Sequence, residues 1–240
     1  MQNLKIPEKI KNKIQDFVQG LEYIYRQDLI SSVLYGSAAS GEFVDKHSNL
    51  NILVVLKNTD LENIKKSSGL IRKFSMIDPL FLTEDYIKTS TDIFPIEFLD
   101  MQENYYVLYG KDVLKDITVE INNLRFQCEQ ELKAKLINLR QAYLRLNKDK
   151  LSLRNLLFKS SNSILHILRN VLRLKGKGAP YLKQDILKEV ALEFQIDISL
   201  WEKILASRNK QIKINHKDIE DLFIKFIKDL EKIIEIVDKL

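Results

Sequence analysis

Two pairs of residues in the stretch 34–56 have types and spacing that suit phosphate binding. The stretch reads LYGSAASGEFVDKHSNLNILVVL, with Gly36 and Ser37 after one apolar run and Asn49 and Asn51 opening the next. Glycine lets the backbone approach a ligand closely, and a serine hydroxyl beside the first amides of a helix can bind a phosphate oxygen. Because side chains alternate along a strand, Asn49 and Asn51 should lie on one side. This pattern predicts a phosphate pocket faced by two amide side chains.

The elements that would position these residues are two strands joined through a short helix. LISSVLY (29–35) is typical of a strand, and residues of about 38–43 are expected to form the short helix. The second strand, 49–56, begins with alternation and ends as a continuous apolar run, which indicates burial on both faces.

The rest of the first half predicts a small α/β domain with a mixed sheet, residues 1–115. Apolar residues at steps of three and four predict a first helix from Pro7 to about residue 26, and a second helix is expected over 60–74. Further strands are predicted at 76–82, where Pro79 favours a sheet edge or a bulge. Another is predicted at 93–99, and 105–110 is ambiguous between strand and helix.

After residue 116 the sequence has helical period almost throughout, which predicts an all-α antiparallel bundle over 116–240. The expected fold class is therefore α/β (α+β), a mixed-sheet domain followed by a helical bundle. The expected helices cover about 120–146, 153–174, 183–194, 198–207 and 217–239.

The stretch 34–56 resembles the signature of the polymerase-β-type nucleotidyltransferase superfamily, which is a strand, Gly-Ser, a short helix, and Asp-x-Asp opening the next strand. Gly36, Ser37 and Gly41 match this signature, and Ser48 matches the serine often found before the first aspartate. The helical second half is similar to the C-terminal bundles of kanamycin-nucleotidyltransferase-like proteins, as are the segments 94–114 and 124–144. The likeness covers most of the chain.

The resemblance implies a metal site whose two aspartates are replaced by Asn49 and Asn51. Asparagine keeps a carbonyl oxygen but lacks the negative charge that holds Mg²⁺. The superfamily's third carboxylate lies on a later sheet strand, for which Glu97 is the first choice, Asp100 the second and Asp78 the third. Glu97 could equally be an ordinary solvent-facing strand residue.

In kanamycin-type enzymes a glutamate of the helical domain acts as general base. Glu131 and Glu129 lie on the long helix in a comparable region, and neither aligns uniquely. An exposed helix glutamate is the competing interpretation of both.

The resemblance thus implies a nucleotidyltransferase-like protein that binds a nucleoside triphosphate, with Mg²⁺ as cofactor if it is active. The two asparagines favour weak or lost transfer of a nucleotide to a hydroxyl, as in a pseudoenzyme. One alternative is a non-enzymatic interaction or dimerisation module. Another is an antitoxin-like or RNA-binding protein, because residues 116–240 hold 24 Lys and Arg against 17 Asp and Glu.

Composition narrows the remaining classes. No apolar run is long enough to cross a bilayer, and the charged first residues do not form a secretory signal. The one cysteine, Cys128, excludes an internal disulfide. A cytoplasmic protein that acts without a membrane, and that is able to form oligomers, is the expectation.

Overall fold

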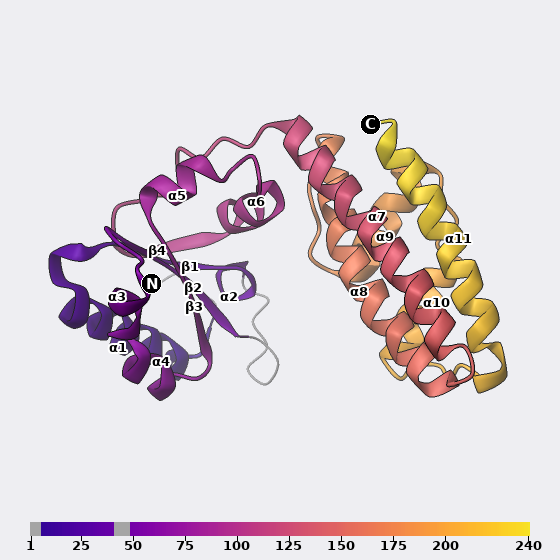
Figure 1. Ribbon diagram of the computed structural model, residues 1–240, viewed down its shortest axis with the longest axis horizontal. Helices are drawn as coiled ribbons and strands as arrows, with labels where there is room; N and C mark the ends of the chain where they lie inside the picture. The colour runs from indigo at the N-terminus through magenta and orange to yellow at the C-terminus, as the bar shows by residue number, and fades with distance from the viewer. Residues whose placement is uncertain (1–5, 41–48) are drawn as a thin grey trace. The chain divides into compact units, whose positions relative to one another are not determined.

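A mixed sheet of four strands organises the first part of the chain, in the order β3-β2-β1-β4 (Figure 1). The computed structural model describes residues 6–40 and 49–240, and the chain divides into two units, residues 1–119 and 120–240. Strand β1 is antiparallel to both of its neighbours, whereas β2 and β3 run parallel. The strands are β1 (Leu29–Tyr35), β2 (Leu50–Leu56), β3 (Ile77–Leu82) and β4 (Tyr105–Gly110).

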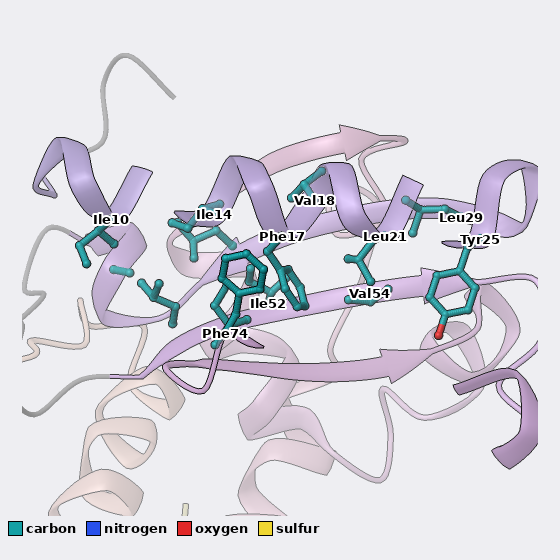
Figure 2. Close-up of a cluster of buried hydrophobic side chains, with 14 of the residues drawn as sticks. Ile10, Ile14, Phe17, Val18, Leu21, Tyr25, Leu29, Ile52, Val54 and Phe74 are labelled. Atoms are coloured by element: carbon teal, nitrogen blue, oxygen red, sulfur yellow. The ribbon is translucent and has the colours of Figure 1, made fainter. Parts of the chain in front are cut away.

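Helix α1 (Glu8–Tyr25) covers one face of this sheet with the apolar stripe predicted from its sequence. Phe17 and Leu21 are fully buried and point toward β2, where Ile52 and Val54 belong to the same cluster (Figure 2). Phe17 also meets Phe74 edge to face, with ring centroids 5.8 Å apart. The helix begins after Pro7, whose fixed φ suits a helix start.

The other face of the sheet packs against two further helices, α5 (Glu84–Thr89) and α6 (Pro95–Glu103). Leu53 and Val55 of β2 join Ile87 and Phe98 from these helices in a second cluster. Successive residues of β2 therefore enter different cores, which explains why this strand is apolar at almost every position.

The strand predicted at 93–99 is wrong, because residues 95–99 belong to helix α6. Pro95 occupies the first turn, where a missing N–H costs no helical hydrogen bond. Phe98 and Met101, three residues apart, then bury the same helix face in the second core cluster. The apolar run IFPIEFL fits a strand and a buried helix equally well by composition.

The helix expected over 60–74 is divided into α3 (Leu61–Lys65) and α4 (Ser68–Lys73). Ser67 lies at the break, fully buried, and its hydroxyl donates to the carbonyl oxygen of Ile64 at 2.8 Å. This bond offers the backbone an alternative to continuing the helix, as serine commonly does.

Both edges of the sheet carry a residue that fits its position. Strand β3 is one edge, and its Pro79 lies opposite Ile52, so a residue without an N–H occupies an edge strand. Strand β4, the ambiguous 105–110 segment, is the other edge and ends at Gly110 with φ of +72°. A Cβ at Gly110 would lie 2.1 Å from the carbonyl oxygen of Ile30, so glycine permits the close approach of β4 to β1.

The second unit is entirely helical, which confirms the predicted fold class. Helix α8 contacts each of the other four long helices and buries Leu157, Ile164 and Leu168. Asp149 caps α8 by accepting backbone N–H groups of Leu151 and Ser152. The helices are α7 (Ile121–Leu146), α8 (Lys150–Leu174), α9 (Lys183–Phe194), α10 (Ser199–Arg208) and α11 (Ile219–Asp238).

Two short 3₁₀ turns, Arg26–Asp28 and His216–Asp218, precede β1 and α11. Within residues 6–40 and 49–240, no helix has both the length and the apolar character that crossing a membrane requires.

Candidate functional site

A row of four side chains crosses the sheet where β1 ends and β2 begins. Asn51 pairs with Tyr35 of β1 on one side and with Asp78 of β3 on the other. Tyr35 pairs in turn with Tyr105 of β4. Because cross-strand partners point to the same face of a sheet, these four side chains lie side by side. Tyr35 and Tyr105 pack against the second core cluster, so the row lies on the face covered by α5 and α6.

Gly36 brings the backbone of β1 against the side chain of Asn51. Its φ is +77°, a left-handed conformation that glycine adopts without a steric cost. A Cβ at this position would lie 3.1 Å from Nδ2 of Asn51. The chain then turns into the short helix α2 (Ser37–Ser40), in which the Ala39 N–H donates to the Gly36 carbonyl oxygen at 2.9 Å.

The hydroxyl of Tyr35 stays protonated well above neutral pH. Burial raises the pKa of Tyr35 to about 12, and the negative charge of Asp78 adds to the effect. A protonated phenol can donate a hydrogen bond. Tyr35 is therefore a neutral donor, with the Asn51 amide beside it and the second core cluster packed against it.

Tyr105 extends the row to a second carboxylate. Its hydroxyl donates to Oδ2 of Asp112 at 3.1 Å, and Oδ1 of Asp112 accepts backbone N–H groups of Leu114 and Lys115. Burial raises the pKa of Tyr105, with further contributions from its hydrogen bond to Asp112 and from the charge of that carboxylate. Asp112 is therefore held in a turn and oriented toward Tyr105.

The two asparagines differ in exposure. Asn49 precedes β2 and is exposed, whereas Asn51 is half-buried in the row. Ser37 is half-buried at the start of α2. Ser48 and Gly41, which the sequence signature includes, lie outside the described residues.

Of the three carboxylates considered for the third metal ligand, only Asp78 lies on a sheet strand. Glu97 and Asp100 belong to α6, and Glu97 is exposed, so the choice of Glu97 as a strand residue rests on a strand that does not form. Asp78, the third choice from sequence, lies directly beside Asn51. The pairing of β2 with β3 joins segments distant in sequence, and no local pattern in the sequence reveals its register.

Beside Asn51, the oxygen ligands available to a metal are the Asp78 carboxylate and the Asn51 amide carbonyl, and Asn49 lies just before β2. In the described part of the chain, no group of three or more His, Cys, Asp or Glu residues is arranged to hold a metal ion. Two Mg²⁺ ions require more negative charge than Asp78 supplies. The residues that the structure describes here do not fit a two-metal centre.

Glu131, the candidate base, lies half-buried on α7 and accepts a hydrogen bond from Nε2 of Gln127 at 3.2 Å. Glu129, its alternative, pairs with Nη1 of Arg125 at 2.8 Å and also with Lys133. Both glutamates have partners on their own helix, and the assignment of a base stays a prediction.

Comparison with known proteins gives a likeness of fold. No family model matches the chain, and no curated protein sequence matches it. Among solved structures, a spectinomycin adenyltransferase from Enterococcus faecalis, determined with ATP and spectinomycin, matches with a TM-score of 0.60. The match covers 92% of this chain and 99% of that chain at 13% sequence identity. The chain shares the fold of that adenyltransferase. The predicted nucleotidyltransferase-like fold is therefore confirmed.

Proposed function

We propose that this protein binds a nucleoside triphosphate where β1 ends and β2 begins, and that it transfers the nucleotide weakly or not at all. The observation that carries the proposal is the contact of Gly36 with Asn51, beside Asp78, within an adenyltransferase fold. This is the place at which the signature of the resembled superfamily puts the triphosphate.

Binding is supported by the groups that face this place. Gly36 leaves room for a phosphate to approach the backbone, and the Ser37 hydroxyl follows it directly. The protonated Tyr35 hydroxyl and the Asn51 amide add neutral donors. None of these four groups carries a negative charge, and Asp78 is the carboxylate that lies beside them.

Weak or lost transfer is supported by the charge of the donor set. The asparagines at positions 49 and 51 carry no negative charge, and Asp78 is the carboxylate beside Asn51. Without that charge, a pair of divalent cations has no adequate set of ligands. We therefore expect nucleotide binding that depends little on Mg²⁺.

Calorimetric titration of the four common nucleoside triphosphates, with and without Mg²⁺, tests binding. ATP is the first choice because the structural neighbour was determined with it. The expected result is saturable binding of at least one nucleotide with an affinity that Mg²⁺ changes less than threefold. If no nucleotide binds at millimolar concentration, the proposal is wrong.

The double variant Asn49→Asp with Asn51→Asp tests whether positions 49 and 51 face a bound metal ion. Two new carboxylates beside Asp78 should strengthen nucleotide binding in Mg²⁺ about tenfold or more, about 1.4 kcal/mol, and leave metal-free binding unchanged or weaker. The matched control is Asn122→Asp with Asn155→Asp, which adds the same charge at exposed positions of α7 and α8. An equal gain in both double variants would show that bulk charge, not the row, is responsible.

A further comparison uses pyrophosphate release in the presence of ATP and Mg²⁺. We expect no release by the natural protein above the rate without protein. Robust release by the natural protein would overturn the inactive assignment, and its loss in Asp78→Asn would then identify the carboxylate involved.

A further inference from the structure

A pocket lined by four cationic side chains lies within the helical unit. Its volume is about 550 Å³, and its walls come from α8, from the end of α10 and from the loop that follows α10. The cationic side chains are those of Arg154, Arg208, Lys210 and Lys213, and no acidic residue lines the pocket.

Among the described residues, these four cations have no acidic partners. Within residues 6–40 and 49–240, none of them forms an ion pair. Elsewhere on the same unit, cations do pair, as Arg140 does with Glu231 at 2.6 Å. What sets the pocket apart is that four such cations line one cavity and no acidic residue lines it with them.

The two arginines are positioned by neutral groups. Nη1 of Arg208 donates to Oδ1 of Asn162 on α8 at 2.6 Å. Arg154 lies over the Phe158 ring at 6.0 Å from its centroid, and its Nε is buried without an acceptor in the part of the chain that the structure describes. A buried donor without an acceptor is costly, and an anion in the pocket would supply one.

A fifth cation, Lys183 of α9, lies within electrostatic reach of Arg208. Burial lowers the pKa of Lys183, and the charge of Arg208 lowers it further. Like charges held near one another destabilise the fold unless a counter-charge is present.

The position of these cations near the carboxyl end of helix α10 explains only some of them. Arg208 in the last turn of α10, and Lys210 two residues beyond it, lie where positive charge complements the helix dipole. Arg154 and Lys183 belong to other helices, and Lys213 lies three residues beyond Lys210 in the loop. The convergence of cations from α8, from the end of α10 and from the loop after it requires another explanation.

We propose that this pocket binds a small phosphate-bearing molecule. Guanidinium groups pair with phosphate through two parallel hydrogen bonds, and several cations suit a multiply charged phosphate better than a single carboxylate. Phe158, Ile212 and Ile214 form an apolar wall for the organic part of the ligand. The volume lies within the range of small-molecule sites. All of the residues belong to the second unit, so the inference stands apart from the nucleotide site proposed on the sheet.

Calorimetry of the full chain with inorganic pyrophosphate, at ionic strength held constant with NaCl, tests the pocket. We expect saturable binding that Arg208→Gln with Lys213→Gln weakens at least tenfold. The matched control, Lys203→Gln with Lys225→Gln, removes two exposed charges outside the pocket and should change the affinity less than twofold. No binding to the natural protein at millimolar pyrophosphate overturns the proposal, as does an equal loss in both double variants.

A local readout separates this pocket from the sheet site. Trp201 on α10 is the only tryptophan in the chain, so its fluorescence reports on the helical unit. Pyrophosphate should change that fluorescence in the natural protein and in Asn51→Ala, but not in the Arg208 and Lys213 double variant. Binding that Asn51→Ala abolishes and the double variant retains belongs to the sheet site and overturns the pocket.

Two further ligands distinguish the sources of phosphate. AMP should compete with pyrophosphate, since it combines a phosphate with a group that fits the apolar wall. An RNA oligonucleotide with hydroxyl ends should not compete. If this RNA binds more tightly than AMP, with an affinity that falls steeply as salt rises, the cations form a nucleic-acid surface and the small-molecule proposal is wrong.

Discussion

Tyr35 connects the chemistry of the sheet row to the stability of the fold. Its pKa of about 12 lies above the ordinary value of 10, so the native protein keeps this proton at pH values where the unfolded chain has lost it. The associated stabilisation is complete below pH 10 and is lost as the pH rises through about 12. By linkage, it amounts to about 1–3 kcal/mol.

We therefore expect Tyr35→Phe to lose less free energy of unfolding between pH 10 and 12 than the natural protein does. Urea unfolding at several pH values over this range measures the difference, and Tyr23→Phe, which removes an exposed tyrosine, is the control. Identical pH profiles for Tyr35→Phe and the natural protein would contradict the raised pKa.

Two neighbouring serines of β1 offer a matched comparison of buried hydroxyl groups. The Ser31 hydroxyl donates to the carbonyl oxygen of Lys111 at 2.6 Å, whereas the Ser32 hydroxyl is buried and has no partner among the described residues. Ser31→Ala should lower the free energy of unfolding by about 1 kcal/mol, and Ser32→Ala should leave it unchanged or raise it. Denaturant unfolding of both variants measures this. Equal destabilisation by the two changes would show that Ser32 has an acceptor after all.

Single site residues could be predicted from the sequence where a suitable residue type stands at a suitable local spacing. Gly36, Asn49 and Asn51 could be selected because one strand places alternate residues on one side, and the structure puts Asn51 against Gly36. Asp78 was ranked below Glu97 because its place beside Asn51 depends on a pairing between strands that only the folded sheet reveals. The cationic pocket was missed for a related reason, since its residues come from separate helices.

At the scale of single elements, the end of α10 shows how a helix stops without glycine. The Gln211 N–H donates to the carbonyl oxygen of Ala206 at 2.9 Å, and Lys210 adopts φ of +61°. This closure usually has glycine at the left-handed position.

Lys210→Gly should therefore raise the free energy of unfolding by about 1 kcal/mol while weakening pyrophosphate binding in the cationic pocket. Asn209→Gly, at a residue with negative φ, is the control and should not stabilise the protein. Thermal unfolding and calorimetry measure the two effects. A loss of both stability and binding in Lys210→Gly would indicate that the lysine supports the loop and not the ligand.

Helices and strands were predicted best where the apolar pattern of a segment fitted only one type of secondary structure. The bounds of β1 and α9 agree with the sequence prediction, because Gly36 follows β1 directly and the buried residues of α9 recur at helical spacing. Segment 93–99 failed because a short apolar run has no distinctive period, and Pro95 begins a helix as readily as it marks a strand edge. The break at Ser67 depends on burial of its hydroxyl, which no local pattern expresses.

At the scale of the whole molecule, the chain forms two units that each bury apolar residues of their own. The first encloses the two core clusters on either side of the sheet, and the second buries the inner faces of five helices. We propose that each unit folds by itself.

Fragments 1–119 and 120–240, produced separately, test this proposal. Each should unfold cooperatively on heating, and the second should retain the Trp201 fluorescence of the full chain, because Trp201 is buried by residues of α11 such as Phe226. Circular dichroism and fluorescence follow the transitions. A fragment that melts without cooperativity would show that its core depends on the other unit.

Gly110 has a consequence for how the chain tolerates change over generations. The close approach of β4 to the Ile30 carbonyl oxygen leaves no space for any side chain at position 110, whatever the protein binds. Gly69 and Gly178, by contrast, have open surroundings. In a library of variants selected only for folding, substitutions at position 110 should be lost before those at the open glycines. Mutational intolerance there would report the geometry of a sheet edge, and it should not be mistaken for the mark of a binding site.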